Sequence, residues 1–311
     1  MTTDGRLQLT IVGGFLGSGK TTWLRHQLFA AHFAGAHVIV NEAAETPVDH
    51  ALLDASGGLT VLADGCACCT GAAAFRDALL AICDRRAEAA TGQLVLETSG
   101  LADPGAIVDL IQSHPVLIRH IVVHEIIVIV DALHGWTALE TQPVAQAQIR
   151  AADRLVLTKT DLAPADDVGR LRALLQWLSP GAAQSGASFG SESSLPGMAA
   201  LPDTSPVLAS DAPAITTCQL DLGPDPDWTA LTLWLSALLH ARGDQIVRVK
   251  GVVAAPAGRL LVQGVRRHVQ SPEILPKTDG PQPDDNRIVL IGSGLSSDAI
   301  ARSFARIAAA G

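Results

Sequence analysis

Short runs of apolar and β-branched residues alternate with longer alanine- and leucine-rich segments of helical period between residue 7 and about residue 178. This alternation is typical of a parallel sheet with helices packed on its faces. We therefore expect an α/β first half with a mostly parallel sheet and flanking helices. The expected strands cover residues 8–12, 37–40, 59–62, 93–96, 126–130 and 154–157.

The pattern changes after Ser179, where Gly, Ser, Ala and Pro dominate as far as about Pro213. Such a composition favours a linker over regular structure. Beyond it, alternating strands are expected near residues 215–220, 246–253, 259–265 and 287–291, with helices near 228–240 and from 296. We expect a first domain over 1–185, a linker over 186–212 and a smaller α+β C-terminal domain over 213–311.

Composition and charge narrow the class of protein. Hydrophobic residues make up 48% of the 311 residues and charged residues 17%, which is typical of a folded chain. The 22 basic and 31 acidic side chains give a net charge of −9, so a broad nucleic-acid-binding surface is not expected. No apolar run reaches the ~18 residues of a membrane span, and the start of the chain lacks a signal-peptide pattern. We expect a cytoplasmic protein without a membrane segment.

Residues 14–21 match the pattern G-x-x-x-x-G-K-[ST], between the first expected strand and the following helix. In such a loop the backbone N–H groups and the helix N-terminus hold phosphates, and the lysine reaches the β- and γ-phosphates. The sequence therefore predicts a P-loop NTPase. The residues expected to hold the nucleotide here are Gly14, Gly17, Ser18, Gly19, Lys20, Thr21 and Thr22.

A second candidate motif follows the fourth expected strand. Glu97 stands at the end of that strand, where its carboxylate would hold Mg²⁺ together with the Thr21 hydroxyl. Gly100 would offer its backbone N–H to the γ-phosphate. The alternative is that Glu97 is a surface residue without a functional role. We take Lys20, Thr21, Glu97 and Gly100 as the expected catalytic residues.

A third motif, Thr158-Lys159-Thr160-Asp161, follows the sixth expected strand. A carboxylate such as that of Asp161 accepts hydrogen bonds from guanine N1–H and the N2 amine, whereas adenine lacks both donors. Asp161 is therefore expected to read the base, and GTP is the expected nucleotide. Thr158 and Lys159 of the same motif are also expected to bind the nucleotide.

Three cysteines, Cys66, Cys68 and Cys69, follow the third expected strand within four residues. They lie too close together for a useful disulfide framework, and thiolates are soft ligands that suit Zn²⁺ or another late transition metal. Two alternatives stay open: small buried core residues, and a redox pair.

Taken together, these motifs resemble the CobW-like GTPases, metal-handling P-loop proteins related to UreG and HypB. The resemblance rests on residues 13–22, 38–42, 65–69, 97–104, 159–162, 248–251, 263–265 and 291–295. It implies GTP hydrolysis to GDP, coupled to delivery of Zn²⁺ or Co²⁺ to a client metalloprotein or a cofactor-biosynthesis protein. On this interpretation Glu42 joins the three cysteines at the metal, and homodimerisation is left open.

The chain departs from the family pattern at two places. Thr158 stands where the family usually has Asn, and Ala43-Ala44 stands where it has Phe-Gly. Two other functions stay open. The change at Ala43-Ala44 gives some weight to a nucleotide- and metal-gated binding module with negligible turnover. An ATP-dependent ATPase or kinase is the other, because a phosphate loop alone does not select the base.

Overall fold

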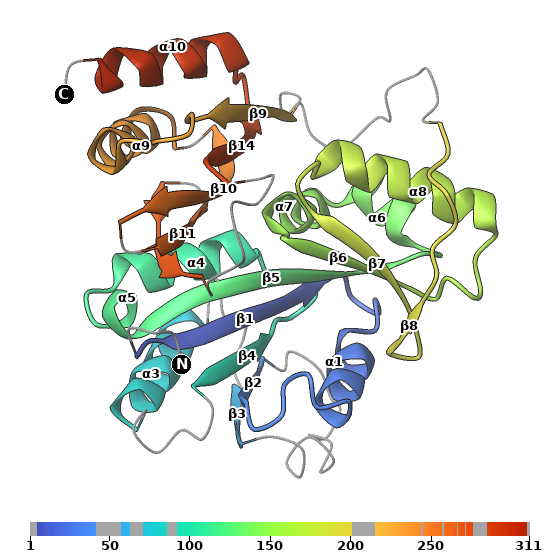
Figure 1. The fold of residues 1–311 in the computed structure, drawn as a ribbon. Helices are drawn as coiled ribbons and strands as arrows, with labels where there is room; N and C mark the ends of the chain where they lie inside the picture. The colour runs from blue at the N-terminus through green and yellow to red at the C-terminus, as the bar shows by residue number, and fades with distance from the viewer. Residues whose placement is uncertain are drawn as a thin grey trace. The chain divides into compact units, whose positions relative to one another are not determined.

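The chain forms two compact units, Met1–Asp211 and Ala212–Gly311, each with a sheet of its own (Figure 1). The structure, a computed structural model, describes residues 5–41, 57–62, 71–85, 92–200, 215–243, 245–256, 258–265, 267–270, 272–275 and 285–309.

The first unit contains an eight-stranded sheet in the order β3-β2-β4-β1-β5-β6-β7-β8. Its strands are β1 (Leu7–Gly14), β2 (His37–Asn41), β3 (Gly58–Leu62), β4 (Gln93–Glu97), β5 (Ile121–Asp131), β6 (Arg154–Thr158), β7 (Ala183–Ser188) and β8 (Ser191–Ser193). All neighbouring pairs are parallel except β7 and β8, which are antiparallel. The mostly parallel sheet and the six expected strands are thus confirmed.

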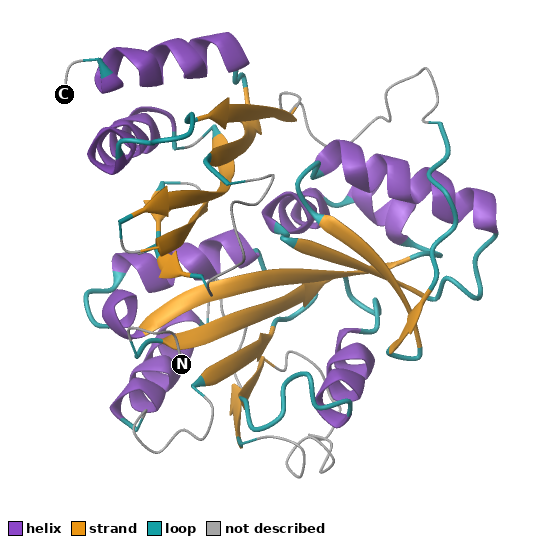
Figure 2. Cartoon of the chain, in the orientation of Figure 1, coloured by secondary structure: helices purple, strands orange, loops and turns teal. Residues whose placement is uncertain are grey.

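Helices flank this sheet (Figure 2). They are α1 (Lys20–Phe29), α3 (Ala72–Asp84), α4 (Pro104–Ser113), α5 (Leu117–His120), α6 (Gly135–Thr141), α7 (Pro143–Ala151) and α8 (Ala165–Leu178). The central strands are nearly continuous runs of buried apolar side chains; Ile11, Ile127 and Leu155 are fully buried. Such runs are typical of parallel strands that are covered on both faces. The loops at the strand ends are therefore attached to a rigid core.

Strand β5 is longer than the hydrophobic pattern predicts, because it begins at Ile121. Leu9 lies opposite Val123 and Thr10 opposite Glu125, so His124 is the extra residue of a β-bulge. The Arg154 Nε donates to Glu125 Oε1 over 3.0 Å. His124 and Glu125 therefore interrupt the run of apolar residues without ending the strand.

The expected linker over 186–212 is not irregular at its start: residues 186–188 end β7, and residues 191–193 form β8. Strand β7 pairs in parallel with β6, with Val156 opposite Ser185 and Leu157 opposite Gly186. A Cβ on Gly186 would lie 2.7 Å from the Ser193 backbone oxygen, so the hairpin requires a glycine there. Small residues have weak strand propensity, and pairing with β6 decides the structure instead.

The second unit is an antiparallel sheet with two helices. Five strands follow the order β12-β11-β10-β14-β9, and β13 pairs with β11. The elements are β9 (Ile215–Asp221), α9 (Trp228–Arg242), β10 (Ile246–Ala255), β11 (Gly258–Val265), β12 (His268–Val269), β13 (Glu273–Ile274), β14 (Arg287–Ser293) and α10 (Ser297–Ala308). Trp234 of α9 packs edge-to-face on Phe304 of α10, with ring centroids 5.4 Å apart. This is the α+β architecture that the sequence predicts.

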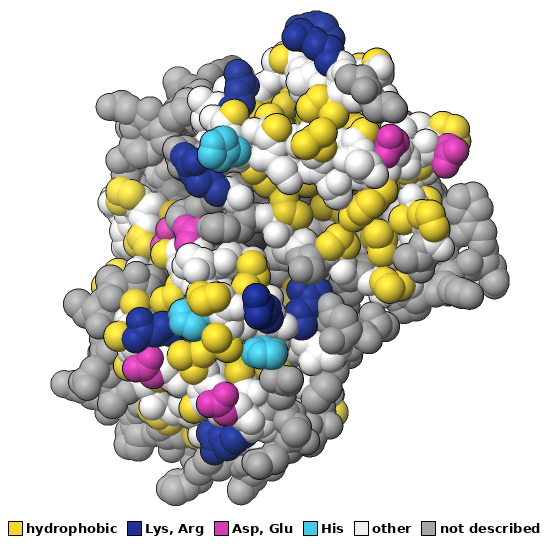
Figure 3. Space-filling model, turned by 90° about the vertical axis from the view of Figure 1, so that its left-hand side faces the viewer, with side chains coloured by type: hydrophobic (Ala, Val, Ile, Leu, Met, Phe, Trp, Pro, Cys, Tyr) yellow, Lys and Arg dark blue, Asp and Glu magenta, His cyan; other side chains and the backbone are white. Residues whose placement is uncertain are grey.

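The helices and one face of the molecule bear on membrane binding. None of the helices in the described ranges combines the length and apolarity needed to cross a bilayer. On the face drawn in Figure 3, the described Lys and Arg side chains are interspersed with hydrophobic, acidic and histidine side chains.

Candidate functional site

Three loops that follow β1, β4 and β6 carry the predicted site residues. Carboxyl ends of parallel strands meet at one edge of a sheet, which is where open α/β sheets bind ligands. The structure describes Gly14, Gly17, Ser18, Gly19, Lys20, Thr21, Thr22, Glu97, Gly100, Thr158, Lys159 and Asp161. The predicted metal ligands Glu42, Cys66, Cys68 and Cys69, and the departure at Ala43-Ala44, lie outside the described residues.

The loop between β1 and α1 depends on its glycines. Gly14 has a φ of 138°, and a Cβ there would lie 2.3 Å from the Ile129 backbone oxygen. Gly17 and Gly19 have φ values of 73° and 90°, in the left-handed region that other residues rarely adopt. The spacing of the glycines therefore determines the shape of this phosphate loop.

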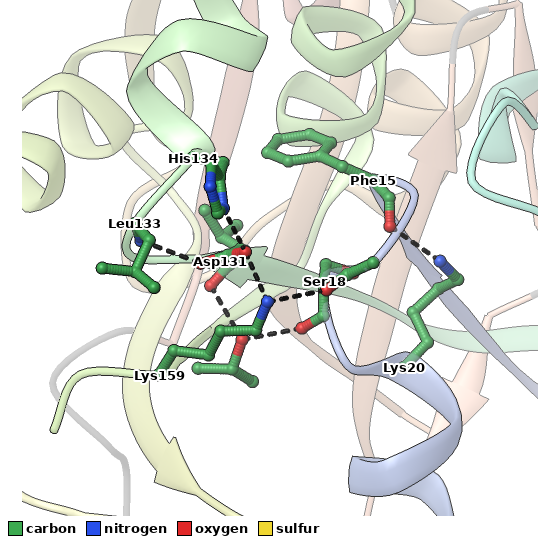
Figure 4. A network of polar contacts seen from close by, with 10 residues as sticks. Phe15, Ser18, Lys20, Asp131, Leu133, His134 and Lys159 are labelled. Atoms are coloured by element: carbon green, nitrogen blue, oxygen red, sulfur yellow. Dashed lines mark hydrogen bonds and ion pairs between the residues drawn. The ribbon is translucent and has the colours of Figure 1, made fainter. Parts of the chain in front are cut away.

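Lys20 begins α1 and folds back onto the phosphate loop (Figure 4). Its Nζ donates to the backbone oxygens of Phe15, at 2.8 Å, and Gly14, at 3.1 Å. The side chain is buried, which lowers the pKa of Lys20, while the charge of Glu97 opposes that shift. An ammonium in such surroundings favours an anion beside it.

Glu97 at the end of β4 contacts Thr21, the second residue of α1. The Thr21 hydroxyl donates to Glu97 Oε1 over 2.5 Å, and Glu97 is 5% exposed. A hydroxyl and a carboxylate in contact beside a phosphate loop are the hard oxygen ligands that Mg²⁺ prefers. These two residues therefore fit a magnesium site.

The segment after Glu97 lies against the phosphate loop. The Thr98 backbone N–H donates to the Val12 backbone oxygen over 2.9 Å. A Cβ on Gly100 would lie 2.6 Å from the Leu16 backbone nitrogen, so the two loops approach too closely for another residue. Asp103 then caps α4 by accepting from the Gly105 N–H. Gly100 thus lies next to the phosphate loop.

The loop after β6 is tied to the phosphate loop by two side chains. The Thr158 hydroxyl donates to the Ser18 backbone oxygen over 2.7 Å. Lys159 has a φ of 57°, and its Nζ donates to the Gly17 backbone oxygen over 3.0 Å. Threonine in place of the family's usual asparagine therefore still ties this loop to the phosphate loop.

Asp131 at the end of β5 belongs to the same cluster, and our sequence analysis did not select it. Its carboxylate is 4% exposed and accepts from Lys159 Nζ, the Leu133 N–H and His134 Nδ1 (Figure 4). Burial alone would raise the pKa of Asp131, but the hydrogen bonds from Lys159 and His134 hold it below its usual value. Its place at the end of a parallel strand was the available signal.

Ser188, also missed, supports the base-reading candidate. Asp161 is exposed, and its Oδ1 accepts from the Ser188 hydroxyl over 3.0 Å. Ser188 ends β7, within the stretch that composition assigned to a linker. Because this stretch was expected to be a linker, Ser188 was not considered as a candidate site residue.

The described residues do not contain a cluster of three His, Cys, Asp or Glu side chains suited to a metal ion. Because the predicted ligands lie outside these residues, the metal-site prediction stays a prediction.

Comparison with known proteins finds relatives that align with nearly the whole chain. The zinc chaperone YjiA of Escherichia coli is 30% identical over 96% of this chain and 98% of its own length. The zinc chaperone CobW of Pseudomonas aeruginosa is 30% identical over 98% and 92%. The crystal structure of the Zn(II)-bound YjiA GTPase from E. coli covers 97% of this chain and 99% of that one, with 26% identity and a TM-score of 0.61.

Two family patterns match the chain. Residues 215–308 match the cobalamin synthesis protein cobW C-terminal domain, which corresponds to the second unit. Residues 8–185 match the CobW/HypB/UreG nucleotide-binding domain and include the phosphate loop, Glu97 and the Thr158–Asp161 motif. The chain therefore belongs to the CobW/HypB/UreG family, in its two-domain form with a CobW C-terminal domain.

Proposed function

We propose that this protein is a GTP-hydrolysing metallochaperone, which couples GTP binding and hydrolysis to the binding and delivery of a transition metal. One observation carries the proposal: the Thr158–Asp161 motif, which we expect to bind guanine, is hydrogen-bonded to the phosphate loop. Thr158 and Lys159 both donate to backbone oxygens of that loop. The relatives named zinc chaperone and GTPase support the same function.

The nucleotide's phosphates would lie in the loop of residues 14–19, on the N-terminus of α1. Lys20 would exchange its backbone acceptors for the β- and γ-phosphates, which a buried ammonium favours. The Gly100 N–H would donate to the γ-phosphate. Asp161 would accept from guanine N1–H and N2, with Ser188 holding its carboxylate in place. Each residue then acts from an element that the sheet core fixes.

The Thr21 hydroxyl and the Glu97 carboxylate, which are in contact, are suited to bind Mg²⁺. When bound there, Mg²⁺ would neutralise charge that develops on the phosphates during transfer. The threonine hydroxyl and the glutamate carboxylate would hold it, and the Lys20 ammonium would balance the remaining phosphate charge.

The transported metal would be held by the thiolates of Cys66, Cys68 and Cys69 together with Glu42. Three thiolates leave the fourth position of a tetrahedral site to Glu42, and a client's ligand would replace that carboxylate during delivery. The two relatives named zinc chaperone favour zinc, with cobalt as the other candidate from the resemblance. A client metalloprotein or cofactor-biosynthesis protein, a homodimer and a cytoplasmic site of action stay predictions.

Phosphate release from GTP and from ATP, measured at equal concentration with Mg²⁺ and with or without Zn²⁺, tests the proposal. We expect GTP to be hydrolysed and ATP to be hydrolysed far more slowly. Equal rates would favour an ATPase or kinase. Tight GTP binding without turnover, with and without Zn²⁺, would favour a nucleotide-gated binding module.

A further inference from the structure

Gln148 lies in the middle of α7 and is fully buried. Its Nε2 donates to the Ala102 backbone oxygen over 2.8 Å and to the Gly100 backbone oxygen over 3.1 Å. Both hydrogens of one side-chain amide are thus directed at the segment that follows Glu97. A buried side chain that satisfies two carbonyls of one turn fixes the position of that turn.

Gly100 is therefore held from two directions. On one side its Cα approaches Leu16 of the phosphate loop so closely that a Cβ would lie 2.6 Å from the Leu16 nitrogen. On the other side its carbonyl accepts from Gln148. A shift of Gly100 toward or away from a phosphate would change the contact with Gln148.

Helix α7 connects this contact to the base-reading loop. It packs against α4, β1 and β5, and it ends at Ala151, shortly before β6 begins at Arg154. Asp153 between them is anchored to β5, since its carboxylate accepts from the Ile126 N–H over 2.9 Å. Strand β6 then leads directly to Thr158 and Lys159. Gln148 is thus placed on the element that joins the γ-phosphate segment to the base site.

The contact also leaves hydrogen-bonding capacity unused. Within the described part of the chain, Gln148 Oε1 and the Ser99 hydroxyl are buried without a hydrogen-bond partner. Among the described residues, Gln148 therefore contacts the turn through its amide hydrogens.

We propose that Gln148 is a positioning residue: it holds the Gly100–Ala102 turn where the Gly100 N–H meets a γ-phosphate, and so favours GTP over GDP. This inference rests on the proposed function. GDP lacks the γ-phosphate, so loss of the Gln148 contact weakens GTP binding and leaves GDP binding nearly unchanged. A merely structural role would weaken both nucleotides alike.

Gln146 provides a matched control on the same helix. It is also buried, at 1% exposed. Its Nε2 donates to the Leu139 backbone oxygen of α6 over 2.8 Å, and its Oε1 accepts from Arg150 Nη2 over 3.4 Å. Gln148→Met and Gln146→Met each remove one buried amide and keep a similar side-chain volume. They differ in which carbonyls lose a donor.

The test measures calorimetric affinities for GDP and for a non-hydrolysable GTP analogue in the full chain and both variants. We expect Gln148→Met to lower the preference for the GTP analogue over GDP by about fivefold, the loss of one hydrogen bond, and Gln146→Met to leave it unchanged. An unchanged preference in a folded Gln148→Met protein, or an equal loss in both variants, would overturn the inference.

If Gln148→Met does not fold by thermal melting, Gln148→Asn replaces it. This variant keeps the amide but shortens the side chain by one methylene, so it cannot reach both carbonyls, and we expect the same loss of preference. An unchanged preference in this variant overturns the inference as well. Failure of the unmodified chain to bind or hydrolyse GTP would instead contradict the proposed function.

Discussion

The Lys159 Nζ lies 2.7 Å from Asp131 Oδ2 and 3.0 Å from the Gly17 backbone oxygen, so one ammonium joins three loops at the sheet edge (Figure 4). The carboxylate is buried and the ammonium is partly exposed. Charge-assisted hydrogen bonds of this kind are stronger than neutral ones. Asp131 therefore fixes the lysine that spans the base motif and the phosphate loop.

Asp131→Asn should weaken GTP binding by roughly tenfold, because hydrogen bonds to a charged group contribute about 1.5–3 kcal/mol. Its amide cannot pair with the Lys159 ammonium as a carboxylate does. Asp153→Asn is the control, since that carboxylate precedes β6 and accepts from the Ile126 backbone N–H of β5, not from Lys159. Calorimetric titration with GTP checks both variants. Equal losses in both would mean that Asp131 acts only on the stability of the sheet.

The same carboxylate should show in the pH dependence of stability. The pKa of Asp131 is held below its ordinary value of 3.8, so its ionised form stabilises the folded state fully above that pH. As pH falls below 3.8 through the lower folded-state pKa, this contribution disappears. The difference in unfolding free energy between the unmodified chain and Asp131→Asn should therefore shrink toward acid pH. Urea titrations at neutral pH and in this acid range measure it; a constant difference would contradict the assignment.

Asp161→Asn should change which base is preferred. An amide accepts from N1–H and donates to a C2 carbonyl, which suits xanthine, whereas guanine presents an amine at C2. We expect GTP affinity to fall and xanthosine triphosphate affinity to rise. Ser188→Ala keeps the carboxylate but removes the hydroxyl that donates to it, and should weaken GTP only modestly. An unaltered base preference in Asp161→Asn would mean that another residue reads the base.

Lys20→Ala should abolish tight nucleotide binding and leave the fold intact. Within the described part of the chain, the ammonium donates to the Gly14 and Phe15 backbone oxygens, so truncation leaves the glycine-determined loop in place. Calorimetry gives the affinity, and circular dichroism checks the fold. GTP affinity equal to that of the unmodified chain would contradict the phosphate-loop assignment.

The candidate site residues that the sequence could indicate are those with a local pattern. The phosphate loop depends on glycines at fixed spacing, and Gly14, Gly17 and Gly19 all have positive φ. Glu97 and Thr158 could be placed because they end buried parallel strands, and the ends of such strands meet at one edge.

Residues whose role depends on distant contacts could not be found this way. Gln148 reaches Gly100 across 48 positions of sequence, and a single glutamine in a helix has no local pattern that marks it. Ser188 was missed for another reason: the small residues of β7 have weak strand propensity, so the pairing with β6 that makes them a strand could not be read from composition.

The cysteine motif leads to the last prediction, on the coupling between metal and nucleotide. The chain should bind one Zn²⁺ through Cys66, Cys68 and Cys69, and affinity should rise with pH because the thiols must lose protons to bind. Replacing all three cysteines with serine should abolish that binding. Replacing Cys83 and Cys218, which are buried in the two cores, should not. Metal binding that survives the triple replacement would place the site elsewhere.

Nucleotide state should then change zinc affinity. Linked sites typically couple by ~1–3 kcal/mol, or roughly 5–150-fold, and reciprocity requires zinc to change GTP affinity by the same factor. We expect the GTP state to hold zinc more tightly, because a γ-phosphate that fixes the segments on both sides of the cysteine motif would bring the thiolates and Glu42 together. Competition with a chromophoric chelator, in the presence of a non-hydrolysable GTP analogue or GDP, measures both affinities. Equal zinc affinities in the two states would exclude a nucleotide-driven metal carrier, even for a protein that binds both ligands.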